Sequence, residues 1–292
     1  GGLMRLAWIG IVAGGVAVLA VALRRRRKPS YSFHVSDTCR WRAHLDVEGF
    51  VVLSGVLAPE ECDEAVSMFW DWLEGLGSGL RRDDPCTWSS EAWPGHQPFG
   101  FLTSHGASQC AAAWRVRSHP SVVRAFSAIW RTDDLLVSLD APIAWRPWWI
   151  DASWTPVVER LHVDQNPFHK PGFQCVQGMV PLVCQTALSG GLQLVPHTHT
   201  DAVQQHLRTS YPHLFSDPDD WCELAPGDPF LGKGQLPVAG RGDLILWDSR
   251  LIHGGLVGTG PTSGAARSLA GQARASVRGI RNRTWRVLTG AP

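Results

Sequence analysis

Hydrophobic residues recur every three or four positions in two stretches of the first half of the chain, residues 59–73 and 120–130. This spacing predicts two helices that each bury one face. Pro59 suits the first turn of the first helix, where its missing N–H leaves no hydrogen bond unmade. Between these helices, residues 81–110 are rich in Pro, Gly, Ser and Trp, which predicts a loop.

The second half has a different pattern, in which short apolar stretches are separated by Gly and Pro. Besides two early strands at residues 48–53 and 135–140, we expect strands at residues 159–164, 173–182, 191–196, 243–247, 251–256 and 272–278. Helices followed by many short strands are typical of a mainly β (α+β) domain, here an antiparallel double-sheet jelly roll with flanking N-terminal helices. Residues 200–240 carry five prolines and are predicted to be a polar insertion, the candidate for a lid.

An uncharged stretch of eighteen residues, 6–23, is followed at once by five basic residues, 24–28. As a helix the uncharged stretch would be about 27 Å long, close to the thickness of the hydrocarbon core of a membrane. By the positive-inside rule, it predicts a single-pass transmembrane helix with the rest of the chain on the cytoplasmic side. A cleaved signal or transit segment and a buried helix are the alternatives. The chain thus divides into an anchor with its basic stop segment, residues 1–29, and one domain, residues 30–292.

Outside the basic run no long block of like charge occurs, and the formal net charge is +1. A nucleic-acid partner is therefore not expected, because binding to a polyanion needs a basic surface. The seven cysteines contain no C-x-x-C pair, which argues against a zinc ribbon or a disulfide framework and favours free thiols in a reducing compartment. Fifteen tryptophans indicate a packed aromatic core, a lined pocket or both.

Two histidines and one carboxylate carry the candidate chemistry. His162 and Asp164 are two positions apart in an expected strand, so their side chains should face the same side, and His253 lies in a later strand. Two imidazoles and one carboxylate leave three metal positions open, which an Fe(II) oxygenase needs for bidentate 2-oxoglutarate and for O2. An H-x-D pair alone is weak evidence, because one arises easily by chance among twelve histidines.

The wider pattern of motifs resembles the phytanoyl-CoA dioxygenase family. It comprises the H-x-D pair, a Gln-Gly strand at 177–178, a Gly-Gly turn at 190–191, and the element G-D-x-x-x-W-D-x-R-x-x-H at 242–253. The resemblance covers residues 46–277. It implies a double-stranded β-helix of the cupin-like jelly-roll class, Fe(II), 2-oxoglutarate as cosubstrate, and hydroxylation by O2.

Carried over to this chain, the resemblance makes His162, Asp164 and His253 the iron ligands and catalytic centre. It also implies hydroxylation rather than halogenation, because related halogenases have a small residue where this chain has Asp164. The substrate is expected to be a small molecule. The predicted membrane anchor favours a lipid-derived substrate. This expectation rests only on the predicted location of the protein and on analogy.

The family also has an arginine after the last histidine, at the start of the next strand, whose planar fork binds the distal carboxylate of 2-oxoglutarate. Arg274 and Arg267 are the candidates here. We prefer Arg274 because it opens a strand-like run, whereas Arg267 lies in a segment rich in Gly, Ser, Thr and Ala. Gln177 either contacts the cosubstrate or substrate, or is a polar residue within strand pairing.

The end of the chain departs from the family pattern, because residues 277–284 are more basic and less apolar than a closing strand should be. Two alternatives therefore stay open. One is a catalytically inactive, membrane-tethered binding module on the same fold. The other is a cupin-like metal enzyme that works without 2-oxoglutarate.

Overall fold

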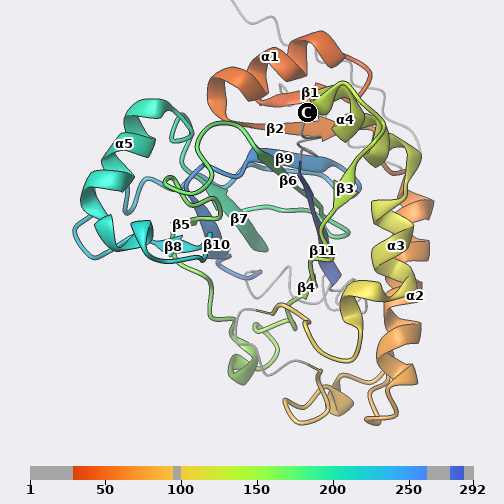
Figure 1. Cartoon of the computed structure of the whole chain (residues 1–292). Helices are drawn as coiled ribbons and strands as arrows, with labels where there is room; N and C mark the ends of the chain where they lie inside the picture. The colour runs from red at the N-terminus through yellow and green to blue at the C-terminus, as the bar shows by residue number, and fades with distance from the viewer. Residues whose placement is uncertain (1–28, 95–99, 262–276, 286–292) are drawn as a thin grey trace, which may run out of the picture.

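A computed structural model describes residues 29–94, 100–261 and 277–285 of the chain. Two β-sheets form its centre, with α2, α3 and α4 on one side and α5 on the other, beside β5 and β8 (Figure 1). The helices are α1 (Thr38–Glu48), α2 (Pro59–Gly75), α3 (Ala111–Arg117), α4 (Pro120–Trp130) and α5 (Asp201–Ser210).

The larger sheet has seven strands in the order β1-β2-β9-β6-β11-β3, with β4 paired to β11. They are β1 (Ser32–His34), β2 (Phe50–Ser54), β3 (Leu136–Val137), β4 (Pro142–Ala144), β6 (Cys175–Val180), β9 (Leu244–Asp248) and β11 (Val277–Trp285). The smaller sheet has four strands in the order β7-β10-β5-β8. They are β5 (His162–Val163), β7 (Gly190–Leu194), β8 (Cys222–Glu223) and β10 (His253–Val257). Apart from the parallel β1–β2 pair, these strands pair antiparallel, as the predicted two-sheet domain requires.

Alternation along the strands of the larger sheet sorts the side chains into two layers. Leu244 and Leu246 of β9 belong to the core shared with the helices, whereas Ile245 and Trp247 belong to a second core that includes Leu194 of the smaller sheet. Helix α4 packs closely against this face of the sheet at Gly178 of β6. A Cβ atom at that position would lie only 2.8 Å from the ring of Phe126. The other face of the larger sheet borders the space between the two sheets.

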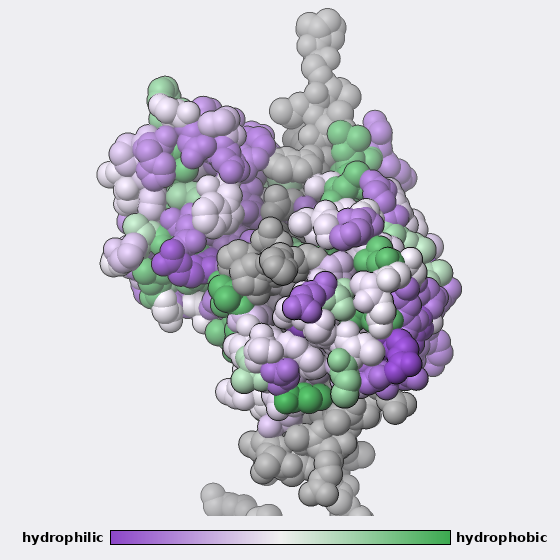
Figure 2. Space-filling model, turned by 90° about the horizontal axis from the view of Figure 1, so that it is seen from below, coloured by the Kyte–Doolittle hydropathy of each residue, from purple (hydrophilic) through white to green (hydrophobic). Residues whose placement is uncertain are grey.

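The smaller sheet shows the same alternation. Val163 of β5 packs outward in one buried cluster with Leu207 of α5. The neighbouring positions 162 and 164 therefore face the larger sheet. The lobe around α5, on the left in both views, has a mainly hydrophilic surface with scattered hydrophobic residues (Figure 2), because α5 buries its apolar residues against the sheet.

The two predicted helices are confirmed as α2 and α4, and α4 has the predicted bounds of residues 120–130. The description of residues 200–240 as a polar insertion missed a helix, because this segment contains α5 and packs on the outer face of the smaller sheet. The predicted strand at residues 135–140 is reduced to the two residues of β3. Residues 38–48 and 111–117 form helices that the apolar pattern had not indicated.

The basic segment near the end of the chain does form a strand, contrary to the doubt raised by its composition. Six consecutive residues of β11, from Ile280 to Trp285, pair with β6, and β11 also pairs with β3 and β4. Pairing along both edges satisfies the backbone hydrogen bonds whatever the charge of the side chains.

The predicted membrane anchor, residues 6–23, lies outside the described residues, and so do residues 272–276 of the last predicted strand. Among the helices that the structure does describe, none combines the length and the apolar character needed to span a bilayer.

Candidate metal centre and adjoining cavity

The two histidines of the candidate site come from adjacent strands. His253 at the start of β10 and His162 at the start of β5 are direct partners in the antiparallel pair, and their ring centroids lie 4.5 Å apart. Asp164 follows two positions after His162, so its side chain points to the same side of the strand. All three side chains are buried, and one potential ligand atom from each lies within 4.8 Å of the others.

The carboxylate of Asp164 lies against both imidazoles. One of its oxygens is 3.2 Å from Nε2 of His253, and the other is 3.7 Å from Nε2 of His162. Each Nδ1 lies close to a backbone carbonyl two residues earlier in the chain, at 2.7 Å from Arg160 O and 2.8 Å from Leu251 O. An Nδ1–H that donates to such a carbonyl leaves the lone pair on Nε2, the atom that faces the centre.

These observations fit a metal ion. Nε2 of His162 is buried, and within the described part of the chain it has no hydrogen-bond partner. Burial, followed in size by the charge of nearby His253, lowers the pKa of His162 to about 4. The imidazole is therefore neutral at physiological pH, as a metal ligand must be. A neutral nitrogen aimed at a carboxylate and a second imidazole is a donor set for a transition metal.

Gln177 lies behind the carboxylate rather than in the open part of the site. Its Nε2 donates to Asp164 Oδ2 at 2.7 Å, and the side chain is fully buried in β6. The two roles proposed from the sequence, a contact with the cosubstrate or substrate and a polar residue within strand pairing, stay predictions. The hydrogen bond to Asp164 orients the carboxylate, as partners of metal ligands commonly do.

The turn that leads into β10 is held by a charge pair. Asp248 accepts hydrogen bonds from Nε and Nη2 of Arg250 at 3.0 and 2.7 Å, and both side chains are largely buried. Trp247, just before this turn, is buried between the sheets with its ring 5.5 Å from that of His253. Together the ion pair and Trp247 fix the strand that carries His253.

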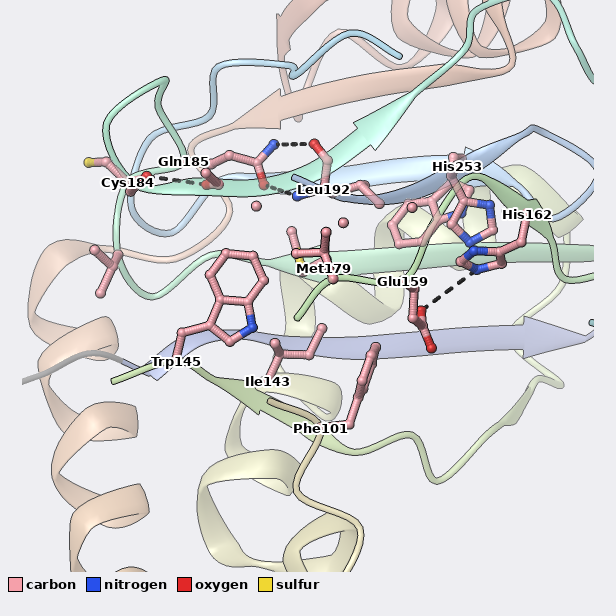
Figure 3. Close-up of a pocket in the computed structure, with 18 residues that line it drawn as sticks. Phe101, Ile143, Trp145, Glu159, His162, Met179, Cys184, Gln185, Leu192 and His253 are labelled. Atoms are coloured by element: carbon pink, nitrogen blue, oxygen red, sulfur yellow. Dashed lines mark hydrogen bonds and ion pairs between the residues drawn. The ribbon is translucent and has the colours of Figure 1, made fainter. Parts of the chain in front are cut away.

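A cavity opens beside the two histidines, and Figure 3 shows its lining. Most of the side chains that line it are apolar, among them Phe101, Ile143, Trp145, Met179, Leu192 and Trp247. Among the tryptophans, Trp145 and Trp247 line the cavity. No cavity-lining residue in the described ranges comes from residues 200–240, so the lid predicted there does not cover this cavity.

The wall next to the histidines depends on a glycine in β10. A Cβ atom on Gly254 would lie 2.7 Å from Arg160 O and 2.9 Å from Glu159 O, both backbone atoms. Only glycine allows β10 to approach the segment before β5 this closely.

The two arginines predicted to bind the cosubstrate, Arg274 and Arg267, lie outside the described residues. Within the described strand β11, Arg281 is opposite Met179 and Arg283 is opposite Gln177. Directly opposed residues in an antiparallel pair share one face of the sheet. These register positions therefore belong to the face that carries Met179 and Gln177.

Sequence reasoning also missed Glu159. Its carboxylate lies 3.8 Å from Nε2 of His162, and it is one of the residues that line the cavity. Glu159 belongs to no motif, and its place three residues before a predicted ligand was the only available hint.

Comparison with known proteins adds a family to this geometry. The family model described as phytanoyl-CoA dioxygenase (PhyH) matches residues 45–263, a stretch that includes all three clustered residues. The chain is 30% identical over 230 residues to Ava biosynthesis cluster protein O of Aspergillus versicolor, covering 73% of this chain and 70% of that protein. It is 20% identical over 245 residues to a putative phytanoyl-CoA dioxygenase of Dictyostelium discoideum, covering 71% and 68%.

A solved structure shows the same fold at low sequence identity. The non-heme alpha ketoglutarate dependent epimerase SnoN from nogalamycin biosynthesis matches with a TM-score of 0.52 and 15% identity. The match covers 88% of this chain and 92% of the epimerase.

Proposed function

Because this chain belongs to the phytanoyl-CoA dioxygenase family, we propose that it is a non-haem Fe(II)- and 2-oxoglutarate-dependent dioxygenase that hydroxylates a small molecule. The observation that carries the proposal is the buried cluster of two imidazoles and one carboxylate beside a mainly apolar cavity. His162, Asp164 and His253 would hold the iron. When bound, the iron supplies O2 activation, which couples decarboxylation of 2-oxoglutarate to succinate with hydroxylation of a C–H bond.

The protein side of this reaction is positioning and exclusion of water. The backbone carbonyls of Arg160 and Leu251 orient the two imidazoles, and Gln177 orients the carboxylate. The apolar lining of the cavity keeps bulk water from the reacting atoms, which protects a reactive site from side reactions.

The proposal is tested by supplying Fe(II), 2-oxoglutarate and O2 to the purified protein and measuring succinate and oxygen consumption. A screen of acyl-CoA thioesters, free lipids and amino-acid derivatives should find compounds that raise both rates together. Absence of succinate above the protein-free background would favour the inactive binding module, and iron binding with turnover that ignores 2-oxoglutarate would favour the other metal enzyme.

We further propose that Arg281 binds the distal carboxylate of 2-oxoglutarate, alongside the earlier candidates Arg274 and Arg267. Position 281 of β11 is opposite Met179, which comes two residues after Gln177 in β6. This register position belongs to the face of the sheet that lines the cavity. The spacing between positions 177 and 179 would let an arginine opposite Met179 bind the distal carboxylate of 2-oxoglutarate, while the other end of the cosubstrate binds the metal.

Changing Arg281 to leucine is expected to raise the KM for 2-oxoglutarate by about 10- to 100-fold, because hydrogen bonds between charged groups contribute roughly 1.5–3 kcal/mol. The measurement is succinate formation against 2-oxoglutarate concentration, in parallel with Arg274→Leu and Arg267→Leu. A raised KM in one of these two variants, with Arg281→Leu unchanged, would move the assignment to that arginine.

The membrane anchor at residues 6–23 remains a proposal that rests on the sequence alone, and so does a lipid-derived substrate. Retention of the full chain in membranes after alkaline carbonate washing, with release when residues 1–28 are deleted, would support it. Release of both forms would contradict it.

A further inference from the structure

The cavity beside the candidate metal centre carries a negative charge that the proposed reaction does not use. In Figure 3 the carboxylate of Glu159 points toward His162, and its Oε2 is 3.8 Å from Nε2. The backbone of Glu159 is fixed by β10, because Gly255 N donates to Glu159 O at 2.9 Å. The side chain is 27% exposed, so it borders the cavity without being sealed off.

Glu159 stands beside the metal cluster but is not a member of it. Among the described residues, the potential ligand atoms that lie within 4.8 Å of one another come from His162, Asp164 and His253. The Glu159 carboxylate approaches His162 without approaching both of the other two this closely. It lines the cavity beside the cluster, where it can contact a bound molecule.

The Glu159 carboxylate receives no hydrogen bond from the described part of the chain, and its charge contact there is with Nε2 of His162 at 3.8 Å. The other long polar side chain of the lining is fully engaged: Gln185 accepts from Leu192 N, and donates to Leu192 O and Pro237 O. No lysine or arginine occurs among the lining residues between positions 100 and 261. Among the described lining residues, Glu159 thus provides the one carboxylate, next to the histidines, in a mainly apolar wall.

A carboxylate that receives no hydrogen bond from the protein and has mainly apolar neighbours favours a cation and disfavours an anion. 2-Oxoglutarate is a dianion, so Glu159 would repel it rather than bind it. We propose that Glu159 is a specificity-determining residue, and that the substrate is a mainly apolar molecule with a protonated amine or guanidinium close to the carbon that is oxidised. This inference rests on the proposed function and narrows its substrate class.

Three indole compounds that differ only in their terminal group provide the test: tryptamine (ammonium), tryptophol (hydroxyl) and indole-3-propionate (carboxylate). Their affinities are measured by calorimetry without O2, for protein alone and for protein loaded with Fe(II) and 2-oxoglutarate. We expect the wild-type protein to bind tryptamine at least about tenfold more tightly than tryptophol, a difference of about 1.4 kcal/mol. In Glu159→Gln this preference should fall below about twofold, and Glu159→Lys should prefer indole-3-propionate.

Glu223→Gln is the matched control. Glu223 lies on β8 directly opposite His162, but its carboxylate pairs with Arg160 and does not line the cavity. This variant should keep the preference for tryptamine. Equal wild-type affinity for tryptamine and tryptophol, no binding of tryptamine, or a preference that survives in Glu159→Gln would overturn the inference.

The two proposals fail in different ways. Loss of the proposed function would appear as absent Fe(II) and 2-oxoglutarate binding in the wild-type protein, whatever the indole affinities. Failure of the substrate inference would appear as missing amine selectivity in a protein that still binds both.

Discussion

Replacing Asp164 with alanine is expected to abolish stoichiometric Fe(II) binding and to lower succinate formation by more than about 100-fold. Asp164 contributes the only carboxylate of the cluster, and it touches both imidazoles. Without it, two neutral nitrogens remain to hold a dication. Loss of a group that only supports a metal ligand already costs about 10- to 100-fold in affinity or activity, so loss of the ligand itself should exceed this range.

A graded series makes this expectation sharper. Gln177→Met keeps all three ligands and removes only the hydrogen bond to Asp164, so it should weaken Fe(II) binding by about 10- to 100-fold without abolishing it. Asp133→Ala, on an exposed turn far along the chain from the cluster, should leave binding and turnover unchanged. Equal Fe(II) affinity in the wild-type protein and in Asp164→Ala would remove the basis of the metal site.

Replacing Trp247 with alanine is expected to lower the free energy of unfolding by about 3–5 kcal/mol, the range found when a buried Trp or Phe is truncated. Trp247 is 1% exposed and fills the core between the two sheets beside His253. Its removal should also weaken iron binding, because the ring packs against one ligand. Urea unfolding of the metal-free protein, followed by two optical probes to check two-state behaviour, gives the stability change.

Trp114→Ala controls for the loss of a tryptophan as such. Its side chain is 39% exposed and makes one hydrogen bond to Gln109, so the loss should stay near about 1 kcal/mol. A stability loss for Trp247→Ala no larger than that of Trp114→Ala would show that the inter-sheet core is not packed as described.

Local patterns predicted local features well. The stripe of apolar residues predicted the bounds of α4, and the two-residue spacing placed the side chains of His162 and Asp164 on one side of the chain at β5. The pairing of His162 with His253 could not be derived in this way, because strand register between distant segments depends on the whole fold. That step came from the resemblance to a family.

The features that were missed have physical reasons of the same kind. Helix α5 was missed because most of its residues are polar, although Val203 and Leu207 have the four-residue spacing of a buried stripe. Strand β11 looked too basic for a strand, since charge says little about backbone pairing. The place of Glu159 in the cavity wall could not be predicted from the sequence, because it depends on the contact between its backbone and β10.

The fold alone does not decide the outcome of the reaction. SnoN, which shares the fold, is an epimerase, so the product of a given site depends on what the cavity positions beside the metal. In this chain we propose that those determinants are the apolar lining, Glu159 and the carboxylate of Asp164. Substrate identity is therefore best sought among compounds that match the cavity in charge and shape.

The most direct test of the account is anomalous X-ray diffraction at the iron absorption edge, from crystals of the protein grown with Fe(II) and 2-oxoglutarate in the absence of O2. The account predicts one strong anomalous peak per chain, between Nε2 of His162, Nε2 of His253 and a carboxylate oxygen of Asp164. A peak elsewhere in the chain, or none at this place in a crystal that diffracts well enough to show sulfur, would contradict it.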